Sequence, residues 1–186
     1  MTDELERRRR ALEEAFFNKY NEELLSKLRA KALAAEKKRG LAEKTGISDE
    51  KVLDDLLASG VEPQTLAALA LAPLVLLAWR DGVLEPRERN AILHAAKDQK
   101  LEAGSTAYQL LEKWLDARPG DELVAAWKGY VQALKENLPA AAYAALRKDI
   151  LERTRAVARA AGGFLGFAKV TKEEKEILAR IEAILG

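Results

Sequence analysis

Three carboxylates lie close together in the segment Trp79 to Arg89, directly after the most apolar run of the chain. Asp81, Glu85 and Glu88 carry the oxygen ligands that hard divalent cations prefer, so they form a candidate metal site. The alternative is structural: Asp81 begins a turn, while Glu85 and Glu88 suit the first turn of a helix, which favours negative charge. Neighbouring arginines can neutralise these acids as well as a metal could, which favours the structural interpretation.

Other residue patterns that support chemistry are scarce. The chain has no cysteine and a single histidine, His94, so thiol catalysis and sites built from several imidazoles are excluded. It contains neither a phosphate-binding loop nor a dinucleotide-binding glycine motif. We therefore expect a protein that is not an enzyme and that has no cofactor beyond the candidate divalent metal.

Composition and periodicity indicate a helical protein. Hydrophobic residues make up 48% and charged residues 33% of the 186 positions, and no segment shows the alternating pattern of a strand. We predict an all-α fold of seven or eight helices. The 31 basic and 30 acidic side chains nearly cancel, so the whole molecule lacks the positive field that attracts nucleic acid.

Residues 3–39 contain no glycine or proline and predict one long helix, with Gly40 as its stop. We assign an N-terminal helical arm to residues 1–47 and an all-helical domain to residues 48–186. Basic clusters on the arm could meet phosphates of nucleic acid or of an anionic membrane surface, or could be a solvated helix face.

The arm also carries an apolar stripe. Phe16, Phe17, Tyr20 and Leu24 lie on an otherwise charged helix, mostly at intervals of four residues. Such aromatic residues are typical of a helix that binds in the groove of a partner protein. The same side chains could instead pack back onto the domain of their own chain.

Several helix boundaries are readable in the domain. Ser48 predicts a helix start, and Pro63 predicts the start of an apolar helix that reaches Arg80 and is kinked at Pro73. The next helix begins at Glu85 and Pro86. The apolar run is too short to cross a bilayer, and no signal peptide is recognisable, so we expect a cytoplasmic protein.

The segment Gly163 to Phe167 is rich in glycine and apolar residues. Phe164 and Phe167 either fill an interface inside the domain or contact a partner or membrane surface. We count both among the candidate partner-binding residues.

Two parts of the domain look like copies. Leu84 to Glu88 aligns with Val170 to Glu174: each has an apolar residue, a capping residue and a glutamate three positions later. Each segment follows an alanine-rich helix and precedes a helix with one apolar face. The pattern predicts a duplicated helical unit in which each copy covers part of the other.

These motifs, in the pattern LLAWRDGVLEPRERNAILHAA, resemble the TerB-like fold of tellurite-resistance and stress-associated proteins over residues 61–186. The resemblance implies a helical bundle of two related halves that acts as a binding or scaffold domain in stress response. It also implies metal ligands among the acidic residues of the turns. Only the first turn matches, through Asp81, Gly82, Glu85 and Glu88, because the second turn lacks a carboxylate.

Residues 12–45 are similar to the N-terminal segment of the inhibitory zeta subunit of bacterial F-type ATP synthases, through Glu14-Ala15-Phe16, Lys19-Tyr20 and Glu23. The function expected from the whole sequence is a non-catalytic interaction or scaffold module in bacterial stress response, which binds another protein through its N-terminal helix. The alternatives are a divalent-metal sensor and a regulatory subunit of a rotary ATPase.

Overall fold

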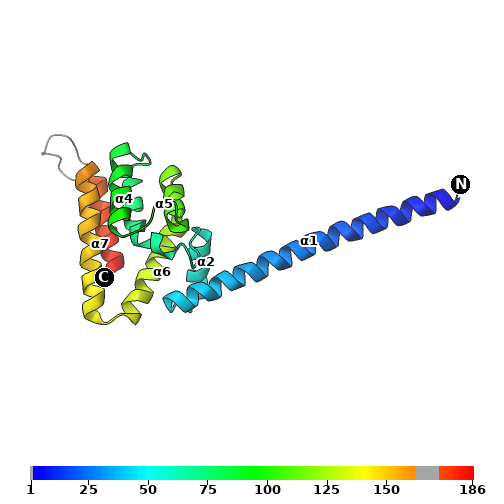
Figure 1. The fold of residues 1–186 in the computed structure, drawn as a ribbon, viewed down its shortest axis with the longest axis horizontal. Coiled ribbons are helices and arrows are strands. Elements are labelled where there is room, and N and C mark those ends of the chain that lie inside the picture. Colours follow the sequence, from blue (N-terminus) through cyan, green and yellow to red (C-terminus); the bar gives the residue numbers. More distant parts are fainter. Residues whose placement is uncertain (1, 162–171) are drawn as a thin grey trace. The chain divides into compact units, whose positions relative to one another are not determined.

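The structure, a computed structural model, describes residues 2–161 and 172–186, and in these ranges every regular element is a helix. This confirms the predicted all-α fold class. The described chain forms eight α-helices and one 3-10 helix (Figure 1). They are α1 (Thr2–Thr45), α2 (Glu50–Ala58), η1 (Leu66–Leu71), α3 (Ala72–Ala78), α4 (Pro86–Asp98), α5 (Thr106–Asp116), α6 (Asp121–Asn137), α7 (Ala140–Ala161) and α8 (Lys172–Leu185).

The chain divides into two compact units. Residues 1–39 are the arm, and residues 40–186 form a second unit that we call the core unit. The division lies ahead of the predicted boundary after residue 47. Its physical basis is that Leu41 and Ile47 are buried in the hydrophobic cluster of the core unit.

The first helix does not stop at Gly40, so that prediction is wrong. A Cβ atom on Gly40 would lie 2.8 Å from Cγ of Pro63, which shows that glycine is required there for close packing. The helix ends at Thr45, and Gly46 follows with φ of 74°, a left-handed conformation that glycine adopts without steric cost.

The helix start predicted at Ser48 is displaced by one residue. Asp49, not Ser48, caps α2, because its carboxylate accepts the backbone N–H groups of Lys51 at 2.8 Å and Val52 at 3.2 Å. At the start of α6, Gly120 is the cap and Asp121 is the first helical residue. Asp121 there still lies in the first turn, where the helix dipole favours an acid.

The apolar segment after Pro63 is not one kinked helix. It forms η1 and then α3, and Pro73 lies in the first turn of α3. A proline at that position removes no intrahelical hydrogen bond, because the first N–H groups of a helix have no partner in any case. The chain thus avoids the predicted kink by changing helix type just before the proline.

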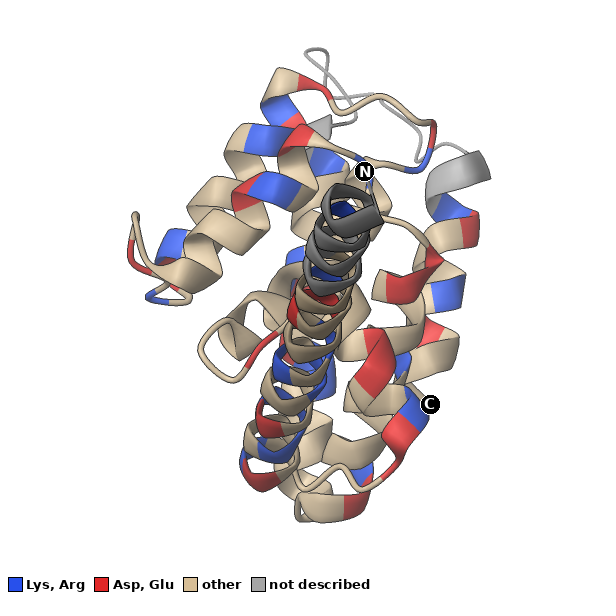
Figure 2. Ribbon diagram, turned by 90° about the vertical axis from the view of Figure 1, so that its right-hand side faces the viewer, with Lys and Arg blue, Asp and Glu red and all other residues tan. Residues whose placement is uncertain are grey.

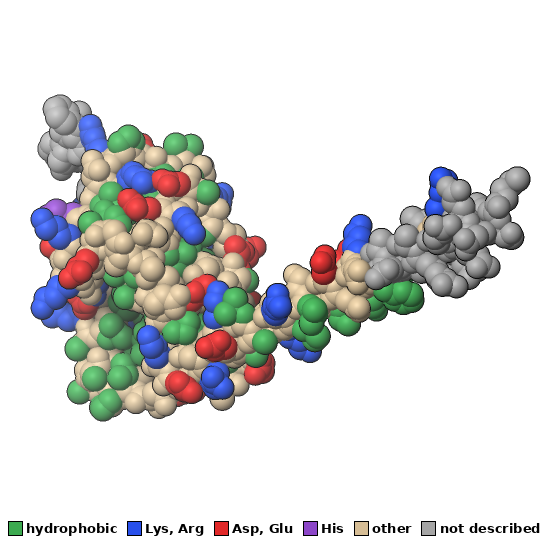
Figure 3. Space-filling model, turned by 45° about the vertical axis from the view of Figure 1, so that its right-hand side comes forward, with side chains coloured by type: hydrophobic (Ala, Val, Ile, Leu, Met, Phe, Trp, Pro, Cys, Tyr) green, Lys and Arg blue, Asp and Glu red, His purple; other side chains and the backbone are tan. Residues whose placement is uncertain are grey.

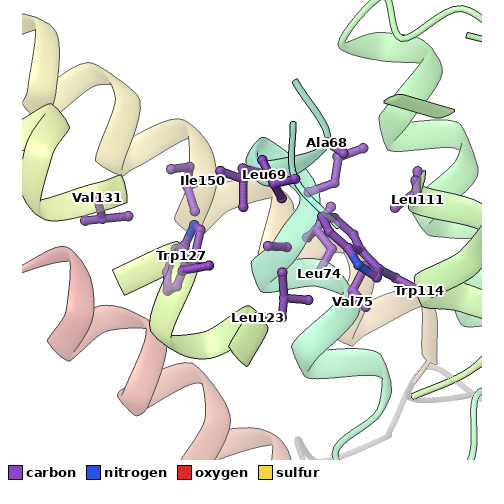
Figure 4. Close-up of a cluster of buried hydrophobic side chains, with 14 of the residues drawn as sticks. Ala68, Leu69, Leu74, Val75, Leu111, Trp114, Leu123, Trp127, Val131 and Ile150 are labelled. Atoms are coloured by element: carbon purple, nitrogen blue, oxygen red, sulfur yellow. The ribbon is translucent and has the colours of Figure 1, made fainter. Parts of the chain in front are cut away.

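The hydrophobic centre of the core unit lies where η1, α3, α5, α6 and α7 meet (Figure 4). Trp127 and Leu123 of α6 are buried beside Leu69 and Leu74. Trp114 is also buried, and its Nε1–H donates to the Ser59 carbonyl oxygen at 3.1 Å. The burial of these large side chains removes apolar surface from water and so stabilises the bundle.

The two helix pairs predicted to be copies pack against each other. Helix α7 contacts both α3 and α4, and α8 contacts α3 and α6 as well as α7. Figure 2 shows basic and acidic residues interspersed along the helices. The predicted cap at Thr171 lies outside the described residues.

Candidate protein-interaction surface

The arm exposes a row of large apolar side chains. In the space-filling view they gather along one edge of the helix (Figure 3). Phe16 is 67% exposed, Phe17 60% and Tyr20 56%. We call the whole row the apolar stripe; its members are Phe16, Phe17, Tyr20, Leu24, Leu25 and Leu28.

Helix geometry places these residues on one side of α1. Positions four residues apart differ by about 40° around the helix axis, so Phe16, Tyr20, Leu24 and Leu28 form a slowly turning row. Phe17 falls within the same arc, and its ring packs edge-to-face on that of Phe16 with centroids 6.1 Å apart. The stripe is therefore a continuous apolar surface with an aromatic end.

The charges around the stripe are predominantly positive. Residues 16–39 contain seven basic and three acidic side chains, a net charge of +4. Lys19 and Glu22 lie on the face of the helix that points away from the middle of the stripe. The arm is thus an amphipathic helix whose apolar stripe is flanked mainly by basic residues.

The predicted acidic site after α3 is a turn followed by a helix cap. Asp81 Oδ1 accepts the Val83 N–H at 3.1 Å, and Gly82 between them has φ of 85°. Such a bond from an aspartate to the backbone two residues later is the usual device that closes a turn. Asp81 therefore closes the turn that follows α3, in the segment where the sequence offered a metal site.

Glu88 is the most buried acid of the described chain, with 1% exposure. One oxygen accepts the Glu85 N–H at 3.0 Å, and the other is ion-paired with Arg80. The first contact is half of a capping box, in which the third residue of a helix reaches back to the cap. Glu88 fixes the start of α4 and neutralises Arg80.

These contacts do not produce a metal centre. The part of the chain that the structure describes contains no group of three or more His, Cys, Asp or Glu residues able to hold a metal ion. Asp81, Glu85 and Glu88 are close in sequence, but they do not form such a group. His94 is exposed and its Nδ1 lies 3.2 Å from Asp98 Oδ2, one helical turn away.

The shifted titratable groups belong to helix packing. Burial raises the pKa of Tyr130, and it raises the pKa of Tyr143 although the positive charge of Arg147 opposes the change. Tyr143 donates its hydroxyl to the Leu185 carbonyl oxygen at 2.8 Å and so ties α7 to the end of α8. Burial also lowers the pKa of Arg153.

The structure brings together four of the six predicted partner-binding residues: Phe16, Phe17, Tyr20 and Leu24. Phe164 and Phe167 lie outside the described residues. Sequence reasoning did not include Leu25 among the binding residues, although it is 50% exposed. The pairing of Leu24 with Leu25 repeats that of Phe16 with Phe17, and this repetition was the available signal.

Comparison with protein-family models, curated proteins and solved structures found no match to this chain. Among the described residues, no helix combines the length and the apolar character needed to span a membrane.

Proposed function

We propose that this chain is a non-catalytic protein-interaction module that binds a partner protein through the arm. The observation that carries the proposal is the distribution of exposed large hydrophobic side chains. Within the described residues, all of them except Val83 lie on the arm. A contiguous apolar surface on a helix is costly in water, and its usual purpose is association.

The shape and charge of the surface indicate the kind of partner. An amphipathic helix of this type binds in an apolar groove, where side chains at intervals of three and four residues act as anchors. Each fully buried Phe or Leu contributes about 1.5–3 kcal/mol. The net charge of +4 around the stripe favours a groove whose rim is acidic.

The resemblance of residues 61–186 to TerB-like domains supports a role in bacterial stress response. In this proposal the core unit is the scaffold from which the arm acts. The Asp81 turn contributes to the scaffold by positioning α4, and not by binding a ligand.

The experiment compares two variants of the full chain in affinity capture from cells, followed by direct binding to the purified captured protein. The test variant carries Phe16→Ala, Phe17→Ala and Tyr20→Ala. The matched control carries Lys19→Ala and Glu22→Ala, on the other side of the same helix. Alanine preserves helix formation in both.

We expect the affinity of the triple variant for the partner to fall at least about a hundredfold, because three aromatic anchors of the interface are removed. The control should bind within about threefold of the unmodified chain, because exposed charges at an interface rim contribute little. Equal binding by the triple variant and the unmodified chain would disprove the proposal.

A further inference from the structure

A separate feature lies in the core unit, where α3, α6 and α8 enclose a cavity of about 430 Å³. This volume is within the usual range for small-molecule sites. The floor of the cavity is made of branched aliphatic side chains and one indole. These residues are Leu76, Trp79, Val124, Ile177, Ile181 and Ile184.

We call the solvent-exposed part of the lining the mouth of the cavity; it contains Arg118, Arg180 and the acid Asp121. Arg80 also lines the cavity, but its side chain is largely buried. Arg80 is already paired with Glu88. Arg118 and Arg180 form no ion pair within the ranges that the structure describes, so one net positive charge remains after Asp121 is counted.

Arg118 is held near the turn that the sequence marked as a candidate site. Its Nη1 would be only 3.7 Å from a Cβ atom placed on Gly82. A Cβ atom at Gly82 would make an ordinary van der Waals contact with the guanidinium, so Arg118 lies beside the Asp81 turn. The Arg118 guanidinium at the mouth of the cavity and the Asp81 turn are therefore neighbours in space.

The floor offers almost nothing to a polar ligand. The one polar side-chain group of the floor is the Trp79 Nε1–H, and it already donates to the Trp114 carbonyl oxygen at 2.8 Å. At the mouth, Pro119 has no N–H, and the Gly120 N–H donates to Glu122 Oε1 at 3.2 Å. A peptide backbone buried here would leave its amides unpaired, at a cost of about 1–3 kcal/mol each, whereas a hydrocarbon chain has no such groups.

From the apolar floor and the arginines at its mouth, we propose that this cavity binds a single-chain amphiphile with a carboxylate headgroup. The hydrocarbon chain lies along the floor, and the carboxylate accepts hydrogen bonds from Arg118 and Arg180. Guanidinium groups suit this role because they donate planar, charge-assisted hydrogen bonds to a carboxylate. This site is independent of the arm and of the protein partner proposed above.

The test is equilibrium dialysis of the full chain with decanoate, kept below its micellar concentration, and in parallel with 1-decanol. We expect saturable binding of one decanoate per chain. The variant Arg118→Gln with Arg180→Gln should bind decanoate at least about tenfold more weakly, because charge-assisted hydrogen bonds are lost. Its affinity for 1-decanol should be unchanged.

Two controls make the assignment specific. Arg87→Gln removes an exposed arginine outside the cavity and should bind decanoate as the unmodified chain does. Val124→Phe fills the floor and should weaken both decanoate and decanol, with circular dichroism used to verify the fold. The proposal is overturned if decanoate does not bind saturably, or if the double arginine variant binds it as tightly as the unmodified chain.

Discussion

The arm and the core unit are built from similar helix-forming and apolar side chains, but they place them in opposite environments. On the arm, Phe16 is 67% and Tyr20 56% exposed. In the core unit, Trp127 of α6 is 1% exposed and Leu123 is fully buried. The difference shows that a helical apolar stripe specifies a surface for association, and that neighbouring helices decide whether this surface is buried within the unit.

The physical reason is that a helix cannot bury its own apolar face. In the core unit α2 packs on α6, and α7 packs on α3 and α4, so each stripe is covered. The arm is one stretch of a single helix, and within it there is no second element to cover the stripe. Its content of alanine, leucine and charged residues gives the arm a high intrinsic helix propensity.

The largest expected effect is in the core. Trp127→Ala removes a fully packed indole and should lower the free energy of unfolding by about 3–5 kcal/mol. The measurement is denaturant unfolding followed by tryptophan fluorescence, since the remaining Trp79 and Trp114 report on the core unit. A loss below 1 kcal/mol would mean that α6 is not the centre of the packing.

The next effect concerns the buried ion pair. Glu88→Gln should lower the free energy of unfolding by about 2–3 kcal/mol, because Arg80 loses its charged partner in a buried setting. Glu85→Gln is the matched control in the same turn; its side chain is exposed, and the cost should stay within about 1 kcal/mol. Equal costs for the two substitutions would contradict the role assigned to Glu88.

A smaller effect is expected where the core unit begins. Gly40→Ala should lower the free energy of unfolding by about 1–2 kcal/mol, because the added Cβ meets Pro63, although alanine is the better helix former. In the background of Pro63→Ala the contact is removed, and Gly40→Ala should then raise stability by up to about 1 kcal/mol. If Gly40→Ala instead raises the free energy of unfolding of the chain that retains Pro63, the packing explanation is refuted.

The smallest effect on folding is expected on the arm. Phe17→Ala should change the free energy of unfolding of the core unit by no more than about 0.5 kcal/mol, since its side chain is exposed. The same fluorescence-monitored unfolding measures this. A cost above 1 kcal/mol would show that the stripe is buried by its own chain, which was the alternative interpretation of the sequence.

Local signals predicted much of the fold because they act over a few residues. The start of α4 at Glu85 and Pro86 follows from capping chemistry, which is complete within one turn of helix. Gly40 was misread, since its role depends on Pro63, which is distant in sequence. The acids near Asp81 could not be assigned from spacing alone, because the burial of Glu88 against Arg80 requires the packed helices.

The sequence by itself determined the helical class, the amphipathic character of the arm and the start of α4 at Glu85, since periodicity and capping are local properties. Only the tertiary structure decided which apolar stripes are covered, because burial depends on contacts between helices far apart in the chain. It also decided that Arg118 and Arg180, separated by much of the sequence, line one cavity. A site of this kind has no motif, since its parts come from the α5–α6 connection and α8.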